Sequence, residues 1–383
     1  MIQGSNSVIY DILISGAGPA GSACAIALRN SGLKIALVDR AVFPRDKVCG
    51  DAIPGRAVKV LQQLGPEYES SFRNYAPKLL TKSTRLFYNK RELAFDWKGE
   101  AYTCARMDFD HFLFEKAAAT RIDVFTGERV TQVSRQDDVF TLKTKTGKIF
   151  RSKLLIGADG ANGVTARQLA ARITDKSNHV GSVRAYYNNV TTLRPDTTEV
   201  YFLKNFLPSY MWVFPLPGNR ANVGFGMLTA EISRRRLDLK KLFYEFIDQS
   251  PQLKAQLNGA VQDGALEGFG LPLGGRKVAI SGEGFMLAGD AASIIDPMSG
   301  DGIGNAMVSG VLAASQAISC FERSDLSAGF MKGYDRALDQ RLGSELRLHL
   351  RSRKLLAAFP GMLDVVFAAG SNATLRNLIQ KAL

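Results

Sequence analysis

A glycine-rich turn near the start of the chain is the feature that most restricts its fold. An apolar, β-branched run at 8–15 is typical of a buried parallel strand, and Gly16-Ala17-Gly18-Pro19-Ala20-Gly21 follows it directly. A helical pattern over 22–30 and a second strand over 34–39 complete a βαβ unit of the usual length. In such a unit the glycines permit a tight turn, approach of the backbone to a pyrophosphate, and close packing of helix on strand.

The residues around this turn predict a dinucleotide site. The helix N-terminus offers unpaired N–H groups to phosphates, and Asp39 ends the second strand, where its carboxylate can accept hydrogen bonds from ribose hydroxyls. A 2′-phosphate would be repelled there, which disfavours NADP in this site. The cofactor-binding residues expected from this part of the chain are Gly16, Gly18, Pro19, Ala20, Gly21, Asp39 and Arg40.

Two later segments also combine a strand end, an acid and glycines. Residues 154–160 form an apolar strand that ends at Asp159 on a glycine-flanked turn. Residues 285–307 give a strand, then Gly289-Asp290, then Gly300-Asp301-Gly302 before an apolar helix. Asp290 could bind the hydroxyls of a ribityl chain, and the glycine-rich approach to the helix would present N–H groups to a ring that becomes negative on reduction.

Together these three segments resemble the para-hydroxybenzoate hydroxylase superfamily of flavoproteins, in which the second is the DG motif and the third the GD motif. The resemblance implies one FAD bound by all three, and Arg106 in Arg106-Met107-Asp108-Phe109-Asp110 resembles the superfamily's arginine beside the FAD. A second glycine-rich dinucleotide site is missing, so NAD(P)H or another reductant is expected to visit only transiently. The further cofactor-binding residues expected are Lys47, Cys49, Gly50, Arg106, Val130, Asp159, Gly289, Asp290, Gly300, Gly302 and Ile303.

Three more motifs resemble the geranylgeranyl reductase family in particular, and the resemblance covers about 11–312. The chain departs slightly from the family pattern, with Asp39 in place of the usual Glu, Leu271 in place of Ile, and Pro208 one position nearer Tyr210 than the family's leading proline. The motifs are Lys47-Val48-Cys49-Gly50-Asp51, similar to KxCGE/D, Tyr210-Met211-Trp212-Val213-Phe214-Pro215, similar to YxWxFP, and Leu271-Pro272-Leu273-Gly274-Gly275, similar to IPxGG.

That family binds FAD, reduces it and hydrogenates isolated carbon–carbon double bonds of prenyl chains, so the resemblance implies a hydrophobic or lipid-like substrate. An unactivated alkene is a poor hydride acceptor and must be held against the reduced ring in a dry cavity. Tyr210, Trp212 and Phe214 would supply flat apolar surface, because alternate residues of a strand share a face. The predicted catalytic residues are Cys49, Tyr210 and Trp212, with Cys49 nearest the flavin ring as the family loop places it; plain core roles remain alternatives for all three.

Three other functions compete with a reductase. An FAD-dependent monooxygenase of an aromatic or polyketide substrate is the main alternative, because the same FAD site supports hydroxylation; the Cys49 loop and the aromatic strand argue against it. A flavin-dependent halogenase would carry WxWxIP where this chain has Tyr210 to Pro215, which makes halogenation the weaker alternative. A non-enzymatic flavin-binding scaffold would hold FAD that no substrate turns over.

The order of these patterns predicts an α/β fold. It combines a Rossmann-like FAD-binding domain, an inserted antiparallel-sheet substrate domain and a helical C-terminal region. The predicted boundaries are 1–77, 105–172 and 271–322 for a discontinuous FAD-binding domain, 78–104 and 173–270 for the substrate domain, and 323–383 for the helical region.

The charge of the chain points to anionic partners. A formal net charge of +13 and a pI near 9.6 favour phosphorylated cofactors or acidic lipid surfaces. The basic runs at 234–241 and 347–354 lack the interleaved aromatics of a single-strand-binding groove, so no nucleic acid partner is expected. The basic region at 346–381 could instead lie on an anionic membrane and collect a lipid substrate.

Cysteine and apolar patterns bound the remaining possibilities. Four scattered cysteines without a CxxC pair or a His/Cys cluster predict neither a metal site nor a disulfide framework. The N-terminus lacks the basic region of a signal peptide, and no uninterrupted apolar stretch is long enough to cross a bilayer. We therefore expect a cytoplasmic protein, in peripheral contact with a membrane at most.

Overall fold

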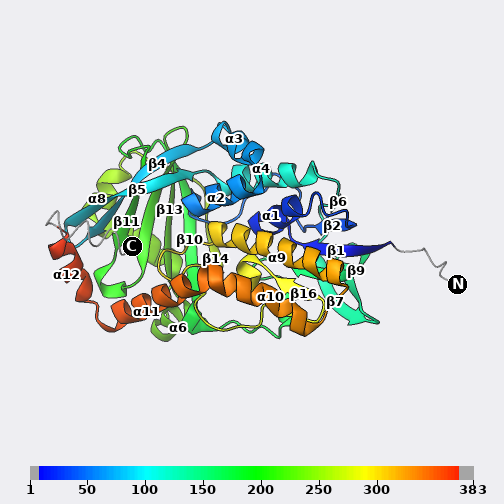
Figure 1. Cartoon of the computed structure of the whole chain (residues 1–383). Helices are drawn as coiled ribbons and strands as arrows, with labels where there is room; N and C mark the ends of the chain where they lie inside the picture. Colours follow the sequence, from blue (N-terminus) through cyan, green and yellow to red (C-terminus); the bar gives the residue numbers. More distant parts are fainter. Residues whose placement is uncertain (1–7, 371–383) are drawn as a thin grey trace.

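The chain folds around two eight-stranded sheets that lie at opposite ends of an elongated molecule (Figure 1). The structure is a computed structural model, and it describes residues 8–370. The first sheet has a parallel core in the order β16-β9-β1-β2-β6, to which an antiparallel hairpin and one short strand are added. Its strands are β1 (Ile9–Ser15), β2 (Ile35–Val38), β6 (Asp123–Phe125), β7 (Val130–Gln136), β8 (Val139–Thr144), β9 (Ile149–Gly157), β15 (Ser281–Gly282) and β16 (Phe285–Leu287).

Helices cover the first sheet, and two of them cross very closely. Residues 12–14 of β1 are fully buried, as expected for a parallel strand covered on both faces. The helix α9 (Ile303–Arg323) packs on α1 (Pro19–Ala27), and a side-chain carbon at Gly310 would overlap with the carbonyl oxygen of Ala20. Glycine there allows the two backbones to meet. The other helices of this half are α2 (Gly55–Leu64), α3 (Pro66–Arg73), α4 (Arg106–Ala118) and α5 (Val164–Leu169).

The second sheet runs in the order β14-β10-β13-β12-β11-β4-β5-β3. It was expected to be antiparallel, and every pairing is antiparallel except that of β4 with β11, which is parallel. The exception arises because the chain leaves β5 for the first sheet and comes back before it forms β11. Its strands are β3 (Ala52–Ile53), β4 (Leu79–Tyr88), β5 (Arg91–Thr103), β10 (His179–Asn188), β11 (Thr197–Phe202), β12 (Tyr210–Leu216), β13 (Arg220–Leu228) and β14 (Val261–Pro272).

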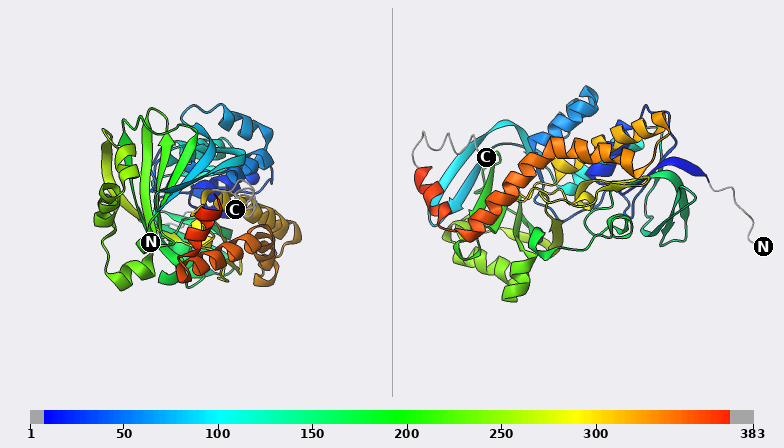
Figure 2. Two further views of the ribbon diagram at one scale, coloured as in Figure 1. Left: turned by 90° about the vertical axis from the view of Figure 1, so that its left-hand side faces the viewer. Right: turned by 60° about the horizontal axis from the view of Figure 1, so that its bottom comes forward.

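The two faces of the second sheet have different partners. One face packs on three short helices. Phe225 of β13 contacts this layer through Phe246, which together with Phe243 belongs to the second of the three helices. The opposite face of β10, β12 and β13 turns toward the half of the molecule that contains the first sheet (Figure 2). The three helices are α6 (Thr229–Arg235), α7 (Leu239–Gln249) and α8 (Pro251–Gln256).

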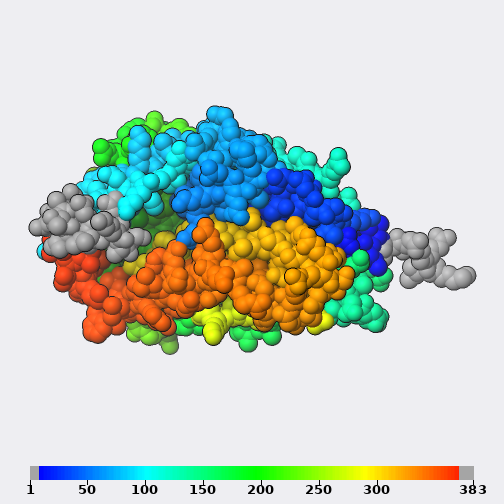
Figure 3. All heavy atoms as spheres, in the orientation of Figure 1, coloured from blue at the N-terminus to red at the C-terminus, as the bar shows by residue number. Residues whose placement is uncertain are grey.

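The C-terminal part is helical, as the sequence predicts, and forms a continuous band along one side of the molecule (Figure 3). It contains α10 (Ala328–Leu338), a π-helical turn (Asp339–Gly343), α11 (Ser344–Ala358) and α12 (Met362–Ala369). The last two helices pack on β4 and β5 through an apolar cluster that includes Leu93 and Phe367. The end of the predicted region, 371–383, lies outside the described residues.

One helix bears on the expectation that no uninterrupted apolar stretch is long enough to cross a bilayer. Within residues 8–370, α9 alone is long and apolar enough by length and composition, with a mean hydropathy of 1.3 over its most apolar window. However, 72% of that window is buried inside the protein. Burial against α1, α2 and α10 explains its apolar composition without a bilayer.

Candidate active site

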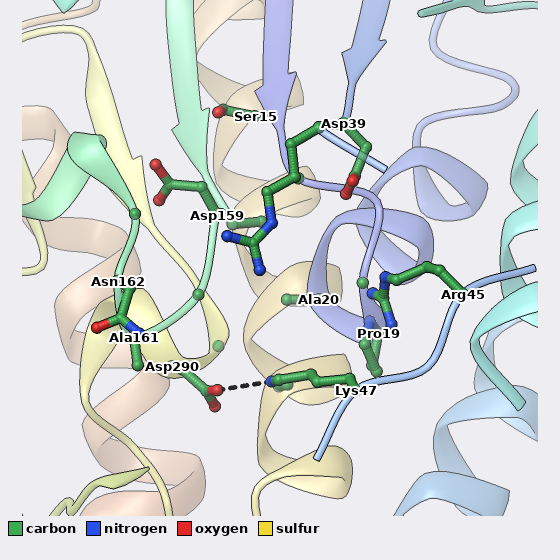
Figure 4. A pocket seen from close by; sticks show the side chains of 18 of the residues that line it. Ser15, Pro19, Ala20, Asp39, Arg45, Lys47, Asp159, Ala161, Asn162 and Asp290 are labelled. Atoms are coloured by element: carbon green, nitrogen blue, oxygen red, sulfur yellow. Dashed lines mark hydrogen bonds and ion pairs between the residues drawn. The ribbon is translucent and has the colours of Figure 1, made fainter. Parts of the chain in front are cut away.

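A cleft opens at the carboxyl ends of the strands of the first sheet, where open α/β sheets bind ligands. Its cavity volume is about 330 Å³, at the lower end of the roughly 300–1,000 Å³ of common small-molecule pockets. The structure brings residues from all three predicted segments to its walls (Figure 4). The predicted residues that line it are Gly16, Gly18, Pro19, Ala20, Asp39, Arg40, Lys47, Arg106, Val130, Asp159, Gly289 and Asp290.

The first and second segments meet at Gly16. This residue has φ of +106°, and a side-chain carbon there would overlap with the carbonyl oxygen of Ala158. A side-chain carbon at Gly21 would overlap with the carbonyl oxygen of Gly16, although Gly21 itself does not line the cleft. Both glycines are therefore needed for close backbone packing, which confirms the predicted geometry of the turn.

Asp39 lies at the end of β2, where Figure 4 places its carboxylate above the cleft. It accepts hydrogen bonds from the backbone N–H of Ala17 at 2.6 Å and of Ala41 at 2.7 Å. The same carboxylate therefore ties the glycine turn to β2 and keeps further lone pairs for a ligand.

Asp159 lines the opposite wall but is bound by its own segment. Its carboxylate accepts hydrogen bonds from the backbone N–H of Thr165 at 3.0 Å and from the Thr165 hydroxyl. Burial raises the pKa of Asp159, and these hydrogen bonds only partly oppose the rise. In this arrangement Asp159 shapes the turn that leads to α5.

Lys47 and Asp290 face each other across the cleft, and the dashed line in Figure 4 joins them. The Lys47 ammonium lies 2.9 Å from the Asp290 carboxylate and 5.1 Å from the centre of the Phe269 ring. This pair connects the Cys49 loop to the late glycine segment. A side-chain carbon at Gly302 would lie 3.6 Å from Asp290, so the start of α9 and Ile303 are next to the pair.

A buried cluster of charges borders the cleft behind the Cys49 loop. Arg106 is 3% exposed and makes two hydrogen bonds of 2.7 Å to Asp110, which also lies 2.7 Å from Arg45. Burial by itself would raise the pKa of Asp110, but the two guanidinium groups hold it below its usual value. The Arg106 guanidinium also lies near the Cys49 thiol, and burial keeps the pKa of Cys49 above that of an exposed thiol despite this cation.

The aromatic residues of β12 form one row, which confirms the prediction that they share a face. The ring centres of Tyr210 and Trp212 are 6.4 Å apart, and those of Trp212 and Phe214 are 6.5 Å apart. Gly226 and Gly224 of β13 lie opposite Tyr210 and Trp212 in the register. Tyr210 and Trp212 therefore stand beside strand positions that carry no side chains.

The row joins the Cys49 loop at one end and the late glycine segment at the other. A side-chain carbon at Gly50 would lie 3.2 Å from Phe214 and 3.4 Å from the indole nitrogen of Trp212. At the other end the Tyr210 hydroxyl donates to the carbonyl oxygen of Ser299 at 2.5 Å, and it would lie 3.0 Å from a side-chain carbon at Gly300. The three predicted catalytic residues thus belong to one continuous surface beside the cleft.

Several residues that line the cleft were not predicted from the sequence. Arg45 could have been found, because it lies between Arg40 and Lys47 in the basic loop after β2. Glu267 and Phe269 come from β14 of the other sheet and carry no local signal. The cleft residues not predicted include Ser15, Arg45, Asp46, Glu128, Arg129, Asn162, Arg167, Glu267 and Phe269.

A cluster of acids and a histidine lies near the glycine segment, although no metal site was predicted. Within the described part of the chain, ligand atoms of Asp296, Glu345 and His349 lie within 4.8 Å of one another. Arg56 already makes two hydrogen bonds to Glu345, and His349 lies 2.5 Å from Asp296. The Arg56 contact attaches α11 to α2, and the His349 contact attaches it to the loop that precedes α9.

The cleft fits the FAD that the motifs imply. Gly18 leaves the turn open toward Arg45, whose guanidinium would lie 3.7 Å from a side-chain carbon at Gly18. A pyrophosphate in this opening would meet both the N-terminal end of α1 and a cation. The aromatic row and the Cys49 loop then border the part of the cleft nearest the start of α9.

Comparisons with known proteins agree with this site. The family model described as "FAD binding domain" matches residues 9–337. A digeranylgeranylglycerophospholipid reductase of Thermoplasma acidophilum is 30% identical over 362 residues, covering 90% of this chain and 86% of the relative. A menaquinone reductase of Mycobacterium tuberculosis is 30% identical over 315 residues, covering 79% and 75%.

A solved structure extends the agreement to the whole fold. The crystal structure of a geranylgeranyl bacteriochlorophyll reductase-like protein from Thermoplasma acidophilum superimposes with a TM-score of 0.84 and 26% identity, covering 96% of this chain and 92% of that one. FAD is therefore the cofactor, and the protein is an oxidoreductase. The chain belongs to the FAD-binding domain family and, within it, to the geranylgeranyl reductase family of FAD-dependent oxidoreductases.

Proposed function

We propose that this protein uses reduced FAD to saturate carbon–carbon double bonds in the prenyl chain of a lipid. The observation that carries the proposal is the row of Tyr210, Trp212 and Phe214 beside the Cys49 loop, which offers apolar surface next to the cofactor cleft. Relatives named for the reduction of digeranylgeranylglycerophospholipid and menaquinone support it, because both molecules carry prenyl chains.

The proposed roles of the residues follow from their surroundings. Bound FAD, once reduced, supplies a hydride, and saturation of an alkene also consumes one proton. Trp212 and Phe214 would hold the chain by apolar contact and exclude water. Because burial keeps the Cys49 thiol protonated, Cys49 can give up a proton, and the guanidinium of Arg106 would stabilise the thiolate left behind.

The polar residues of the cleft would hold the cofactor. Backbone N–H groups at the start of α1, together with Arg45, would bind the pyrophosphate, and Asp39 would accept from a ribose. Lys47 would remain paired with Asp290 or turn to a phosphate. We also propose NAD(P)H as a transient electron donor, a division into domains at the predicted boundaries, and a cytoplasmic location; the separate sheets support the division.

The experiment that tests the proposal is an anaerobic oxidative half-reaction. The purified yellow protein is photoreduced without oxygen and mixed with a lipid that carries geranylgeranyl chains, and the return of oxidised flavin is followed by absorbance. We expect reoxidation accompanied by a lipid product heavier by two hydrogens per double bond. The saturated lipid is the control and should leave the flavin reduced.

Two outcomes would contradict the proposal. Flavin that stays reduced with prenyl lipids and turns over with aromatic substrates only when oxygen is admitted would select a monooxygenase. FAD that neither NAD(P)H nor dithionite can reduce in the folded protein would select a non-catalytic scaffold.

We further propose that α11 contacts an anionic membrane and brings the active site near lipid substrates. Leu348 and Leu355 on its outer side and Phe359 directly after it are 56%, 45% and 61% exposed, among cations. Apolar insertion combined with charge attraction is how interfacial helices bind. The exposed cations of this helix are Arg347, Arg351 and Lys354.

Vesicle co-sedimentation tests the membrane contact. The double variant Leu355→Ser with Phe359→Ser should lose binding to anionic vesicles, whereas Ile173→Ser removes a residue that is 84% exposed outside this helix and should not. Equal binding of both variants would refute a role for α11.

A further inference from the structure

Asn222, a residue of none of the motifs, lies at the centre of the contacts between the aromatic row and the Cys49 loop. It is completely buried on β13, opposite Phe214 of β12 and Tyr186 of β10. A buried side-chain amide is costly unless its donors and acceptor are all paired. Its partners therefore reveal what the position does.

Asn222 uses its full hydrogen-bonding capacity on the active-site surface. Its amide nitrogen donates to the carbonyl oxygen of Cys49 at 2.7 Å and to the carboxylate of Asp51 at 2.8 Å. Its amide oxygen accepts from the indole N–H of Trp212 at 2.8 Å. One side chain thus fixes two of the three predicted catalytic residues relative to each other.

The second contact of the network is Asp51, which follows Cys49 and Gly50. Asp51 is completely buried, has φ of +62°, and accepts a hydrogen bond of 2.8 Å from the Tyr186 hydroxyl. Its other oxygen accepts from the backbone N–H of Arg106 at 3.2 Å. The strained backbone of the loop is held in place by donors from β10, β13 and α4.

Gly224 leaves the space that the Trp212 ring occupies. It lies two residues after Asn222 on the same face of β13, directly opposite Trp212. A side-chain carbon at Gly224 would overlap with the six-membered ring of the indole. The indole therefore fills the space beside Gly224 while its N–H donates to Asn222, and both contacts fix its position.

We infer that Asn222 is a positioning residue of the active site, which holds the Cys49 loop and the Trp212 ring in register for transfer from FAD to the substrate. It acts through these two groups and needs no contact with substrate. The expected effect on the reaction rate rests on the proposed function, because misplacing reacting groups by about 1 Å costs about 100-fold in rate. The expected effect on the position of the Cys49 loop does not depend on which substrate is reduced.

The direct test measures access to Cys49 in the FAD-loaded protein. Cys24, Cys104 and Cys320 are buried, whereas Cys49 is partly exposed, so a small alkylating reagent reports on the loop by mass spectrometry. The variant Asn222→Asp keeps the shape, but its carboxylate cannot donate to Cys49 or Asp51. We expect Cys49 to be alkylated at least about tenfold faster, since an unpaired buried group costs about 1–3 kcal/mol.

The kinetic test separates positioning from cofactor binding. For Asn222→Asp at neutral pH we expect FAD affinity within about threefold of the original and reoxidation by prenyl lipid slowed about 100-fold. Activity should partly recover toward pH 5, because the introduced carboxyl becomes protonated and regains one donor. A general loss of structure would not recover in this way.

Asn178→Asp is the matched control. Asn178 is 8% exposed and its amide also donates to a carboxylate, that of Asp175, at 2.9 Å. It contacts neither the aromatic row nor the Cys49 loop, so labelling of Cys49 and reoxidation should keep their original rates. If Asn222→Asp does not fold, Asn222→Ala gives the same labelling test without the added charge.

Three results would overturn the inference. They are unchanged labelling of Cys49 in Asn222→Asp, slowed reoxidation without recovery at low pH, and loss of FAD affinity parallel to the loss of transfer. If no prenyl lipid reoxidises the original protein, the proposed function fails, and the labelling rates still decide whether Asn222 holds the loop.

Discussion

The two walls of the active site are built by different means. The cofactor wall depends on backbone shape: Gly16 and Gly21 allow strands and helix to approach so closely that any side chain would overlap with a carbonyl. The aromatic wall depends on side chains from distant segments, with Asn222 joining Cys49 to Trp212. Damage to the first should abolish cofactor binding, and damage to the second should spare the cofactor while stopping its use.

The largest effect is expected for Gly21→Ala in the cofactor wall. The added carbon would overlap with the carbonyl of Gly16, and backbone rather than a flexible side chain would have to move. We expect loss of bound FAD and a drop in the free energy of unfolding of about 3 kcal/mol or more, as for severe overpacking. Absorbance of the purified protein and denaturant unfolding measure both.

The control for this prediction is Gly99→Ala in β5. A side-chain carbon there meets nothing within 4 Å. The variant should bind FAD and unfold like the original protein. If Gly21→Ala also bound FAD normally, the turn would not have the packing role assigned to it.

The same contrast explains what the sequence could predict. The Gly16-to-Gly21 turn and Asp39 form a local pattern, so their spacing predicted a dinucleotide site, and the resemblance to a flavoprotein superfamily joined this turn to the segments of Asp159 and Asp290. The parallel pairing of β4 with β11 could not be predicted, because it depends on where the chain returns after leaving the sheet. Asn222 was missed for a related reason: its partners lie 173, 171 and 10 residues away, and only the cross-strand register brings them together.

The next largest effect concerns the charges that border both walls. Asp110→Asn would leave the guanidinium groups of Arg106 and Arg45 close together without their shared carboxylate. Breaking a buried ion pair by removing one partner costs about 3–5 kcal/mol, so we expect a loss of this size in denaturant unfolding. FAD titration should show weaker binding, because both arginines line the cleft.

The exposed pair of Glu231 and Arg234 provides the comparison. It has a similarly short contact of 2.5 Å but is open to solvent on α6. Glu231→Gln should leave unfolding unchanged within error, since exposed pairs contribute little. An Asp110→Asn variant as stable as Glu231→Gln would show that the buried cluster is not required for the fold.

A smaller and more selective effect is expected for Gly224→Ala in the aromatic wall. The added carbon would displace the indole of Trp212 and break its hydrogen bond to Asn222. We expect FAD binding to be retained while reoxidation by prenyl lipid slows about 100-fold. Rapid mixing of the photoreduced protein with lipid measures the rate.

Gly268→Ala in β14 of the same sheet is the control for this substitution. A side-chain carbon there has only an ordinary contact of 3.6 Å, with the carbonyl oxygen of Ser182. Its reoxidation rate should match that of the original protein. Loss of FAD in Gly224→Ala would instead mean that the two walls cannot be perturbed separately.

The smallest effect is a change in how the free energy of unfolding depends on pH. It concerns Asp51, which is hydrogen-bonded to the aromatic wall through Asn222. Burial raises the pKa of Asp51 to about 6, against the hydrogen bonds from Asn222 and Tyr186 that lower it. A carboxyl with a raised pKa binds its proton more tightly in the folded state than in the unfolded chain, where its pKa is about 4. Asp51 therefore contributes its full stabilisation below about pH 4, and this contribution is lost as the pH rises through 6.

Asp51→Asn should remove that part of the pH dependence. Relative to the original protein, the variant should gain about 1–3 kcal/mol in free energy of unfolding between roughly pH 4 and pH 7, because only the original loses a proton-linked contribution there. Burial also raises the pKa of Asp301 to about 6, so Asp301 still contributes to the dependence of the unfolding free energy on pH in this variant. Denaturant unfolding of Asp51→Asn, Asp301→Asn and the double variant should therefore show two separate losses of slope. An Asp51→Asn slope identical to the original would mean that Asp51 ionises as freely in the folded protein as in the unfolded chain, and the carboxylate would then not be enclosed by the aromatic wall.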